Sequence, residues 1–376
     1  MSRSGKGAAG TMPGSPGDAA GAGASATVTP GPATGLPSGG MGRRLMVLLA
    51  VVSLTLAAAG VYAVWSFQEA ASGQEAASAV QVRSADALPG EPFVMFRNTA
   101  PGQGYGQAAT VPLASPAGER ALSGRACYRV YATRTLVSCL AISNGVPTTF
   151  EAAAYGSGFE PVTSWVLGGV PSRTRISPDG SLVATTVFVS GHSYDSAGLS
   201  TETVIHGVDG TDHGNLEEFA LMSGGTRITA PDRNFWGVTF VPGRPEDFYA
   251  TAASGDNIWL VRGSLTDRTL TVVASGVECP SISPDGTRIA FKKSVSGTLL
   301  GHRNAAVLEL STGTVTVLAE ERNLDDQIEW LDNSTVVYGI PRDDSGRDSD
   351  IWSLSTDPGE VPSLLIEHAW SPAVVR

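Results

Sequence analysis

Cysteine and charge are both scarce in this sequence, and their scarcity excludes several classes of protein. Only three Cys occur, and no two of them have the short spacing of a zinc ribbon or of a disulfide-rich miniature scaffold. Charged residues make up 16% of the chain, and 36 Asp and Glu outnumber 25 Lys and Arg. This acidic excess argues against nucleic acid or an anionic membrane surface as a partner of the folded part. The 42% of apolar residues is an ordinary share and predicts a well-buried globular body.

Large apolar side chains are nearly missing from the beginning of the chain, which is dominated by Gly, Ala, Ser, Thr and Pro. A segment of this composition cannot bury enough apolar surface to form a core. We therefore predict that residues 1–44 form a disordered tail.

An uncharged run follows the tail. Residues 45–68 are mostly Leu, Val and Ala, and as a helix they would extend about 36 Å, against a bilayer hydrocarbon core of about 30 Å. Arg43 and Arg44 precede the run and Glu69 follows it, which favours a cytoplasmic N-terminus. We predict a single-pass transmembrane helix in the cytoplasmic membrane. The alternative is a cleaved signal peptide, but the run is long for one and the region before it is unusually extended.

Residues 69–91 are rich in Ala, Ser, Gln and Glu and show little apolar periodicity, so we predict a linker. Residues 92–376 are then expected to form one extracytoplasmic body. Because the first 44 residues are net basic, the remainder is more acidic than the chain as a whole.

One short motif, which we call the Pro-Asp-Gly word, recurs along this body. Ile-Ser-Pro-Asp-Gly at residues 176–180 returns at residues 282–286, and a degraded copy over residues 328–337 has Asn333 in place of the glycine. Pro, Asp and Gly in this order favour a tight turn between two strands. Further short strands follow each turn, so that four-stranded antiparallel units begin near Cys127, Arg173, Gly237, Cys279 and Asp326. Their spacing is typical of β-propeller blades.

The two ends of the body supply the last unit. Residues 93–96 have the pattern of a second strand with no first strand before it, and residues 368–375 have the pattern of a first strand with nothing after it. Pairing these two segments closes the ring and leaves no open edge. We therefore predict an all-β fold, a six-bladed β-propeller closed by the C-terminal strand.

The repeated words also resemble a known family. Residues 176–180 and 282–286, with the apolar runs after them, resemble the repeats of TolB-type β-propellers. Further segments are similar to membrane-anchored TolB-like proteins of actinobacteria: residues 127–132, 187–194, 234–240, 277–281 and 371–376. The resemblance covers nearly all of residues 92–376 and implies the propeller fold. TolB of diderm bacteria has an N-terminal α/β domain and works with outer-membrane partners, whereas this chain has a linker and an apolar helix in that place.

Catalytic motifs are missing from the sequence: there is no Gly-x-Ser-x-Gly elbow, no His-Glu-x-x-His and no Walker loop. Turn capping accounts for Asp179 and Asp285. A second acidic group lacks the spacing of a calcium loop and is interpreted as solvated loop acids: Asp325, Asp326, Glu329, Asp343 and Asp344. We predict no metal and no cofactor. We also expect Trp236, Trp330 and Trp370, on inner strands, to fill the core between blades.

Two classes of function remain. The first is a non-enzymatic recognition scaffold held at the outer surface of the cytoplasmic membrane. The alternative is a propeller enzyme of hydrolase or lactonase type with a metal in the central channel, since propellers carry both kinds of function. The residues expected at the starts of inner strands mix charge and apolarity and do not resemble a cation cage. We therefore favour the recognition scaffold.

Loop lengths indicate which face binds. Turns between first and second strands are mostly tight Pro-Asp-Gly corners, whereas the long stretches fall on the opposite face, which we call the long-loop face: residues 98–106, 190–200, 222–236, 294–303 and 342–349. Long loops on a rigid scaffold commonly carry function. We predict that this face recognises a cell-envelope protein or a small ligand through Gly191, His192, Ser193, Tyr194, Asp232, Asn234, His302 and Asp326.

Two cysteines lie on either side of one expected hairpin. If Tyr131 faces Thr135 across a short turn, Cys127 faces Cys139, and directly opposed residues of an antiparallel pair approach within bonding distance. An exported location permits oxidation. We therefore predict a Cys127–Cys139 disulfide and a free Cys279, with two free buried thiols as the alternative for the pair.

Overall fold

The structure is a computed structural model, and it describes residues 40–75, 80–189, 200–295 and 301–376. The chain divides into two compact units between Trp65 and Ser66. The tail expected over residues 1–44 lies almost entirely outside the described residues.

The described part begins with one long helix, α1 (Gly40–Glu75). Its stretch from Gly42 to Trp65 has a mean hydropathy of 2.3 and none of it is buried. By length and composition this stretch is able to cross a membrane, which agrees with the apolar helix expected over residues 45–68.

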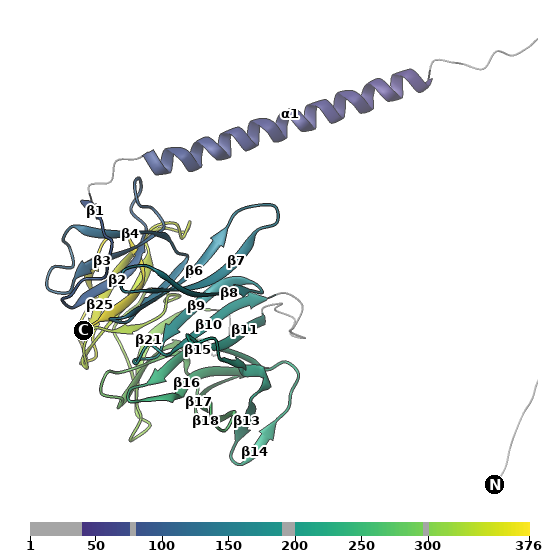
Figure 1. Ribbon diagram of the computed structural model, residues 1–376. Coiled ribbons are helices and arrows are strands. Elements are labelled where there is room, and N and C mark those ends of the chain that lie inside the picture. The colour runs from purple at the N-terminus through teal and green to yellow at the C-terminus, as the bar shows by residue number, and fades with distance from the viewer. Residues whose placement is uncertain (1–39, 76–79, 190–199, 296–300) are drawn as a thin grey trace, which may run out of the picture. The chain divides into compact units, whose positions relative to one another are not determined.

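In the rest of the described residues the regular structure is β, apart from the short 3-10 helix η1 (Leu216–Glu218), and the strands form six sheets (Figure 1). Blade 1 contains β1 (Val82–Ser84), β2 (Phe93–Asn98), β3 (Gln107–Pro112), β4 (Arg120–Ala126) and β27 (Ala369–Val375). Blade 2 contains β5 (Arg129–Ala132), β6 (Leu136–Ser143), β7 (Thr149–Gly156) and β8 (Pro161–Leu167). Blade 3 contains β9 (Val170–Ile176), β10 (Leu182–Val189), β11 (Ser200–Gly207) and β12 (Asp212–Asn215).

The second half of the chain supplies the other three sheets. Blade 4 contains β13 (Ala220–Ser223), β14 (Thr226–Ile228), β15 (Asn234–Val241), β16 (Arg244–Ser254), β17 (Asn257–Ser264) and β18 (Thr269–Ser275). Blade 5 contains β19 (Glu278–Ile282), β20 (Arg288–Ser294), β21 (Arg303–Glu309) and β22 (Val315–Val317). Blade 6 contains β23 (Glu329–Trp330), β24 (Thr335–Pro341), β25 (Ser349–Ser355) and β26 (Ser363–Ile366). The predicted six-bladed β-propeller is confirmed.

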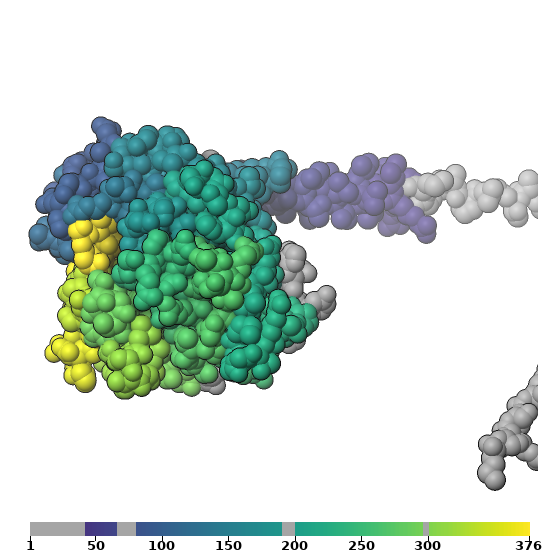
Figure 2. Space-filling view, turned by 60° about the horizontal axis from the view of Figure 1, so that its bottom comes forward, coloured from purple at the N-terminus to yellow at the C-terminus, as the bar shows by residue number. Residues whose placement is uncertain are grey.

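The C-terminal strand closes the ring. β27 pairs with β2 in antiparallel register, with Val374 opposite Val94. Figure 2 shows the yellow C-terminal segment next to the blue beginning of the propeller. Buried side chains of both strands, Val94 and Val374 among them, join one apolar cluster, so closure buries apolar surface as well as pairing backbone groups.

Two blades carry more strands than the expected four. β1 lies within the segment expected to be a linker, and it pairs in parallel with the outer strand β4. β13 and β14 form a hairpin that includes part of a stretch expected to be a long loop, and β13 pairs in parallel with β18. Leu221 of β13 is fully buried beside Leu270 of β18, so the extra strand extends the core of blade 4. A three-residue or four-residue strand has too short an alternating pattern to be recognised in the sequence.

The Pro-Asp-Gly words form the predicted turns. Asp179 accepts hydrogen bonds from the Ser181 amide at 3.2 Å and from both flanking serine hydroxyls. Gly180 has φ 77°, a conformation that glycine adopts without strain. Burial opposes ionisation of Asp179, but these hydrogen bonds outweigh it and lower the pKa of its carboxyl. The interpretation of Asp179 as a turn cap is therefore confirmed.

Fully buried rings of blade 6 pack its inner half against blade 5. Trp330 donates its indole N–H to the Ser281 carbonyl at 2.8 Å, which confirms that this tryptophan fills the core between blades. Tyr338 donates its hydroxyl to Glu320 at 2.7 Å, and Arg322 also donates to that carboxylate. Burial opposes ionisation of Glu320, yet these hydrogen bonds keep its pKa below the usual 4.5.

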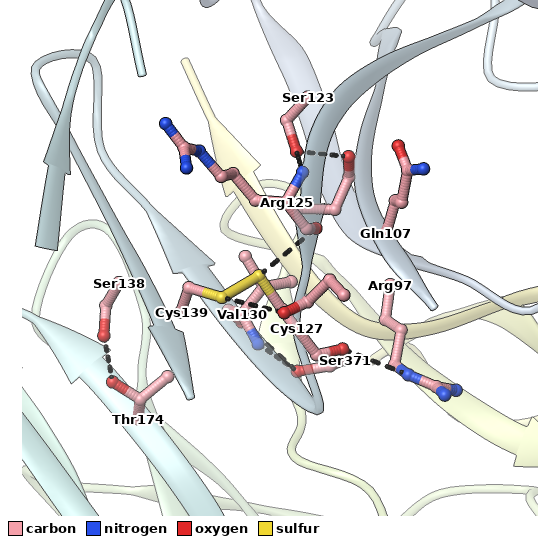
Figure 3. The surroundings of a disulfide bond; sticks show 12 residues. Arg97, Gln107, Ser123, Arg125, Cys127, Val130, Ser138, Cys139, Thr174 and Ser371 are labelled. Atoms are coloured by element: carbon pink, nitrogen blue, oxygen red, sulfur yellow. Dashed lines mark hydrogen bonds between the residues drawn. A yellow bond between two sulfur atoms is a disulfide. The ribbon is translucent and has the colours of Figure 1, made fainter. Parts of the chain in front are cut away.

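The predicted disulfide joins Cys127 to Cys139 (Figure 3). The register from which it was inferred is wrong, because Tyr131 lies opposite Ser138, and Val130 lies opposite Cys139. Cys127 precedes β5, and its Cα atom is 5.3 Å from that of Cys139 across the start of the hairpin. Cys279 is free and buried, as expected.

Candidate functional site

The centre of the propeller contains an unusual number of buried charged side chains. Arg129 of β5, Arg173 and Arg175 of β9, Glu329 of β23 and Asp326 just before β23 are all buried. Charged residues are rarely buried unless they are paired. These five residues place three guanidinium groups and two carboxylates in the central channel.

At the end of the channel nearest the Pro-Asp-Gly turns, Arg175 holds Glu329. Its guanidinium forms an ion pair with that carboxylate and lies over the Tyr131 ring, 4.7 Å from the ring centroid. Burial and the neighbouring Glu329 carboxylate raise the pKa of Tyr131 to about 12, against the opposing effect of Arg175. A cavity of about 330 Å³ opens here, lined by Pro178, Pro284 and other turn residues.

In the middle of the channel, Arg129 faces Asp326. Arg129 Nη1 is 3.5 Å from Asp326 Oδ1, and Arg129 Nε donates to the Ser172 carbonyl at 2.8 Å. Asp326 Oδ2 accepts from the amide of Ser371 in β27 at 2.9 Å. Burial raises the pKa of Asp326, and the Arg129 and Arg173 charges oppose that rise without cancelling it.

At the opposite end lies a second cavity of about 230 Å³, which we call the channel-mouth pocket. Its lining includes five charged side chains, from Arg173, Glu278, Lys292, Arg303 and Asp325. Asn234 and Thr201 add polar groups, and Phe188, Trp236 and Cys279 add apolar surface. These residues stand at the strand ends farthest from the Pro-Asp-Gly turns, so the pocket opens on the long-loop face.

Backbone irregularities gather on the inner strands around this mouth. The register of β15 with β16 shifts between Trp236 and Thr239, and that of β19 with β20 shifts between Glu278 and Ser281. Cys279 has φ 51°, a left-handed conformation that is strained for a residue with a side chain. β-Bulges and strained residues are frequent at functional sites, where they re-aim side chains. The sequence contains no signal for such a shift.

The two strands also approach each other closely at these bulges. Gly237 has φ 68°, and a Cβ there would lie 2.8 Å from the Cα of Cys279. A glycine is therefore needed at this position for steric reasons, because any side chain would push β15 away from β19.

The structure places the predicted site residues in different environments. Asn234 lines the channel-mouth pocket. Asp232 caps the turn after β16, accepting from the Ser254 hydroxyl at 2.7 Å and the Gly255 amide at 2.8 Å. His302 is exposed beside β21. Four others lie outside the described residues: Gly191, His192, Ser193 and Tyr194. Asp326 is the eighth.

Three expectations need correction. Asp326 has no exposed surface, so it is not available for direct contact with a partner; its neighbour Asp325, with a side chain 69% exposed, lines the pocket instead. The sequence reading of Asp326 and Glu329 as solvated loop acids is therefore wrong, because both pair with arginines of other blades. Trp236 was expected to fill the core, but it is half-buried in the pocket lining. Ion pairs between distant strands leave no local pattern in a sequence.

Within the described ranges, no group of three or more His, Cys, Asp or Glu is arranged to hold a metal ion. The carboxylates that reach the channel there face arginine and lysine side chains instead. A guanidinium or ammonium group beside a carboxylate occupies the position that a metal ion would take.

Comparisons with known proteins bear on the fold. No protein-family model matches the sequence, and a comparison with curated proteins finds no match. Among solved structures, TolB from Acinetobacter baumannii is similar with a TM-score of 0.52 and 18% identity, over 77% of this chain and 68% of that one. A putative TolB from Agrobacterium tumefaciens has a TM-score of 0.44 and 12% identity, over 74% and 89% of the two chains. An oligogalacturonate lyase in complex with manganese has a TM-score of 0.44 and 11% identity, over 67% and 72%. The chain thus has a TolB-like fold, a six-bladed β-propeller.

Proposed function

We propose that this protein is a non-enzymatic recognition module, anchored by α1 in the cytoplasmic membrane, that binds a cell-envelope protein or a small ligand on its long-loop face. The observation that carries the proposal is the channel-mouth pocket, where charged, amide and aromatic side chains from several blades converge. Pockets that combine apolar surface with a few convergent polar groups are the usual sites of ligand recognition.

The topology in this proposal is N-terminus inside and propeller outside. Arg43 and Arg44 at the start of the apolar stretch support a cytoplasmic N-terminus, because basic residues remain on that side. The Cys127–Cys139 disulfide supports an oxidising location for the propeller.

The alternative, a hydrolase or lactonase with a channel metal, receives less support. Such an enzyme needs carboxylates or imidazoles that converge on one cation, whereas Asp326 and Glu329 are paired with arginines.

The topology is tested with a reporter fused after Arg376 and with protease added to intact spheroplasts. We expect reporter activity only outside the cytoplasm and removal of the propeller by the protease. Reporter activity in the cytoplasm would overturn the assignment.

The binding face is tested by crosslinking the full-length protein in its native membranes. Phe188→Ala and Asn234→Ala change the long-loop face, and Thr135→Ala is the matched control, an exposed side chain in the turn between β5 and β6. We expect capture of an envelope component by the wild type and by Thr135→Ala, and weaker capture by the other two. Loss of capture with Thr135→Ala alone would place the binding surface on the opposite face.

A further inference from the structure

We propose that the channel-mouth pocket binds a small ligand that carries one carboxylate next to an apolar group. This assignment deepens the recognition role proposed above and rests on it for the choice of face. Three features of the pocket support it: the charges of its lining, its unused hydrogen-bond donors and its size.

The pocket lining carries a positive excess although the protein as a whole is acidic. Arg173, Lys292 and Arg303 supply three positive charges, and Glu278 and Asp325 supply two negative ones. Arg303 Nε donates to Glu278 at 2.7 Å, so that carboxylate is already engaged. Among the described lining residues the positive charges thus outnumber the negative ones by one, and a monoanion would balance that excess.

Lys292 is the most deeply buried of these cations, with a side chain 2% exposed. Its Nζ donates to the Asp325 carbonyl at 3.2 Å and lies 3.8 Å from carboxylate oxygens of Glu278 and Asp325, beyond hydrogen-bond distance. An ammonium group has three donors. Within the part of the chain that the structure describes, only the carbonyl of Asp325 accepts from it. A buried ammonium with spare donors is costly unless a ligand or water accepts from them.

Arg173 provides a second unused donor. Its Nη1 donates to the Ser172 carbonyl at 2.8 Å and its Nη2 donates to the Asp325 carbonyl. Its Nε is buried and has no hydrogen-bond partner among the described residues. These carbonyl bonds hold the guanidinium in a fixed orientation without neutralising its charge.

Asn234 provides the third donor, and its orientation is determined by a neighbour. Its Oδ1 accepts from the backbone N–H of Thr201 at 3.0 Å. Because a backbone N–H only donates, the carbonyl end of the amide must face Thr201, and the NH₂ end points away from it. Asn234 lines the pocket, so a donor from blade 4 joins the donors from blades 3 and 5.

The apolar lining and the size of the pocket indicate which kind of anion it would bind. Phe188, 42% exposed, and Trp236 offer aromatic surface to an apolar group. The cavity of about 230 Å³ is below the roughly 300–1,000 Å³ of pockets for drug-sized ligands, which favours a small molecule. Phosphate groups carry a charge of about −1.5 to −2 near neutral pH. Glu278 and Asp325 would repel that second charge, so a monocarboxylate fits better than a phosphate.

The first test is equilibrium binding to the full-length protein in detergent, with phenylacetate as the probe. Phenylacetamide has the same shape without the charge, and inorganic phosphate has the charge without the apolar group. We expect measurable binding of phenylacetate only. Equal binding of phenylacetamide, or no binding of phenylacetate, would overturn the proposal.

Variants connect this binding to the named donors. Asn234→Asp keeps an oxygen for the Thr201 amide but replaces the NH₂ donors with negative charge, and Lys292→Met removes the ammonium while keeping an apolar stem. The matched control is Lys293→Met, since successive residues of a strand point to opposite faces. We expect at least about tenfold weaker phenylacetate binding for the first two variants and unchanged binding for the control. Affinity retained by both Asn234→Asp and Lys292→Met would refute the assignment.

Cys279 offers a second readout from inside the pocket. Iodoacetate carries a carboxylate and iodoacetamide does not, while both alkylate a thiolate by displacing iodide with formation of a carbon–sulfur bond. An unassisted thiolate reacts more slowly with the anionic reagent, because like charges repel. We expect the order to be reversed at Cys279 and restored by Asn234→Asp, as measured by mass spectrometry of the modified peptide. The ordinary order in the wild type would contradict carboxylate recognition.

Failure of this proposal is distinguishable from failure of the proposed function. Phenylacetate binding and Cys279 alkylation use purified protein and free reagents, whereas the crosslinking experiment measures capture of an envelope component. Capture that depends on Phe188 without carboxylate binding would remove the ligand assignment and leave the recognition role intact.

Discussion

Replacing Asp326 is the most informative perturbation, because the residue connects the middle of the channel with the closing strand. Its carboxylate faces Arg129, whose side chain is 8% exposed, and accepts from the Ser371 amide in β27. Asp326→Ala leaves a buried guanidinium without its counter-charge and a buried amide without its acceptor. Breaking a buried ion pair in this way costs about 3–5 kcal/mol. For a body of this size, that cost corresponds to a fall in the unfolding midpoint on the order of 6–15 °C.

The measurement is thermal unfolding of the full-length protein in detergent, followed by tryptophan fluorescence. The comparison variant is Asp325→Ala, because that neighbouring side chain is 69% exposed and its carboxylate lies no closer than 3.8 Å to Lys292 and 3.9 Å to Arg173. A long, half-exposed ion pair is weaker than a fully buried one, so this variant should lower the midpoint by less than Asp326→Ala does.

A double-mutant cycle then separates the ion pair from the hydrogen bond to β27. If the pair dominates, Asp326→Ala should cost less in an Arg129→Met background than in the wild type. Equal midpoints for Asp326→Ala and Asp325→Ala would refute the reasoning. If Asp326→Ala is strongly destabilised, a loss of partner capture in this variant reflects instability rather than a lost contact, because Asp326 has no exposed surface.

Three further predictions follow from individual contacts. Reduction of the Cys127–Cys139 disulfide should lower the free energy of unfolding by about 3 kcal/mol, and titration of denatured, unreduced protein should find a single free thiol; three would contradict the bond. Gly339→Ala should destabilise the protein by about 1–3 kcal/mol in urea unfolding, because the new Cβ would collide with the indole ring of Trp370. The control Gly90→Ala should be neutral, because no atom lies within 4 Å of the Cβ that it adds. Glu320 has a pKa below 4.5 in the folded state, so its contribution is present above that pH and is lost as the pH falls through the folded pKa. The difference in unfolding midpoint between wild type and Glu320→Gln should therefore be largest near neutral pH and should shrink as the pH falls below 4.5 and through the folded pKa. A difference that stays constant with pH would contradict this prediction.

Much of the fold was predictable because its signals are local. The Pro-Asp-Gly words at residues 176–180 and 282–286 encode the turn between two strands by backbone preference alone, and their recurrence reveals the blade repeat. The apolar run after Arg44 predicts a helix without reference to the rest of the chain. Unmatched strands at residues 93–96 and 368–375 predicted closure because a propeller leaves no strand unpaired, and β2 and β27 do pair.

Register was not predictable to the residue. The disulfide was expected from a hairpin with Tyr131 opposite Thr135, but the turn is wider and Tyr131 lies opposite Ser138. Cys127 and Cys139 still meet, because Cys127 stands before the strand rather than within the paired segment. The predicted disulfide was therefore correct although the predicted register was not. A prediction of which residues lie directly opposite each other would have failed with the same error.

The candidate site depends most on tertiary structure. Loop length drew attention to Asn234, which does line the channel-mouth pocket. Nothing in the sequence around Lys292 or Arg173 predicts their burial in that pocket, and Asp326 was interpreted as a solvated loop acid. Their burial results from the meeting of inner strands that are far apart in the sequence, and register shifts occur in β15 and β19 beside the channel-mouth pocket. Sequence by itself determines turns, strand periodicity and the apolar helix, because these follow from neighbouring residues. The charges that meet in the channel were decided only when six sheets closed into a ring, because an ion pair depends on a distance in space that no local pattern records.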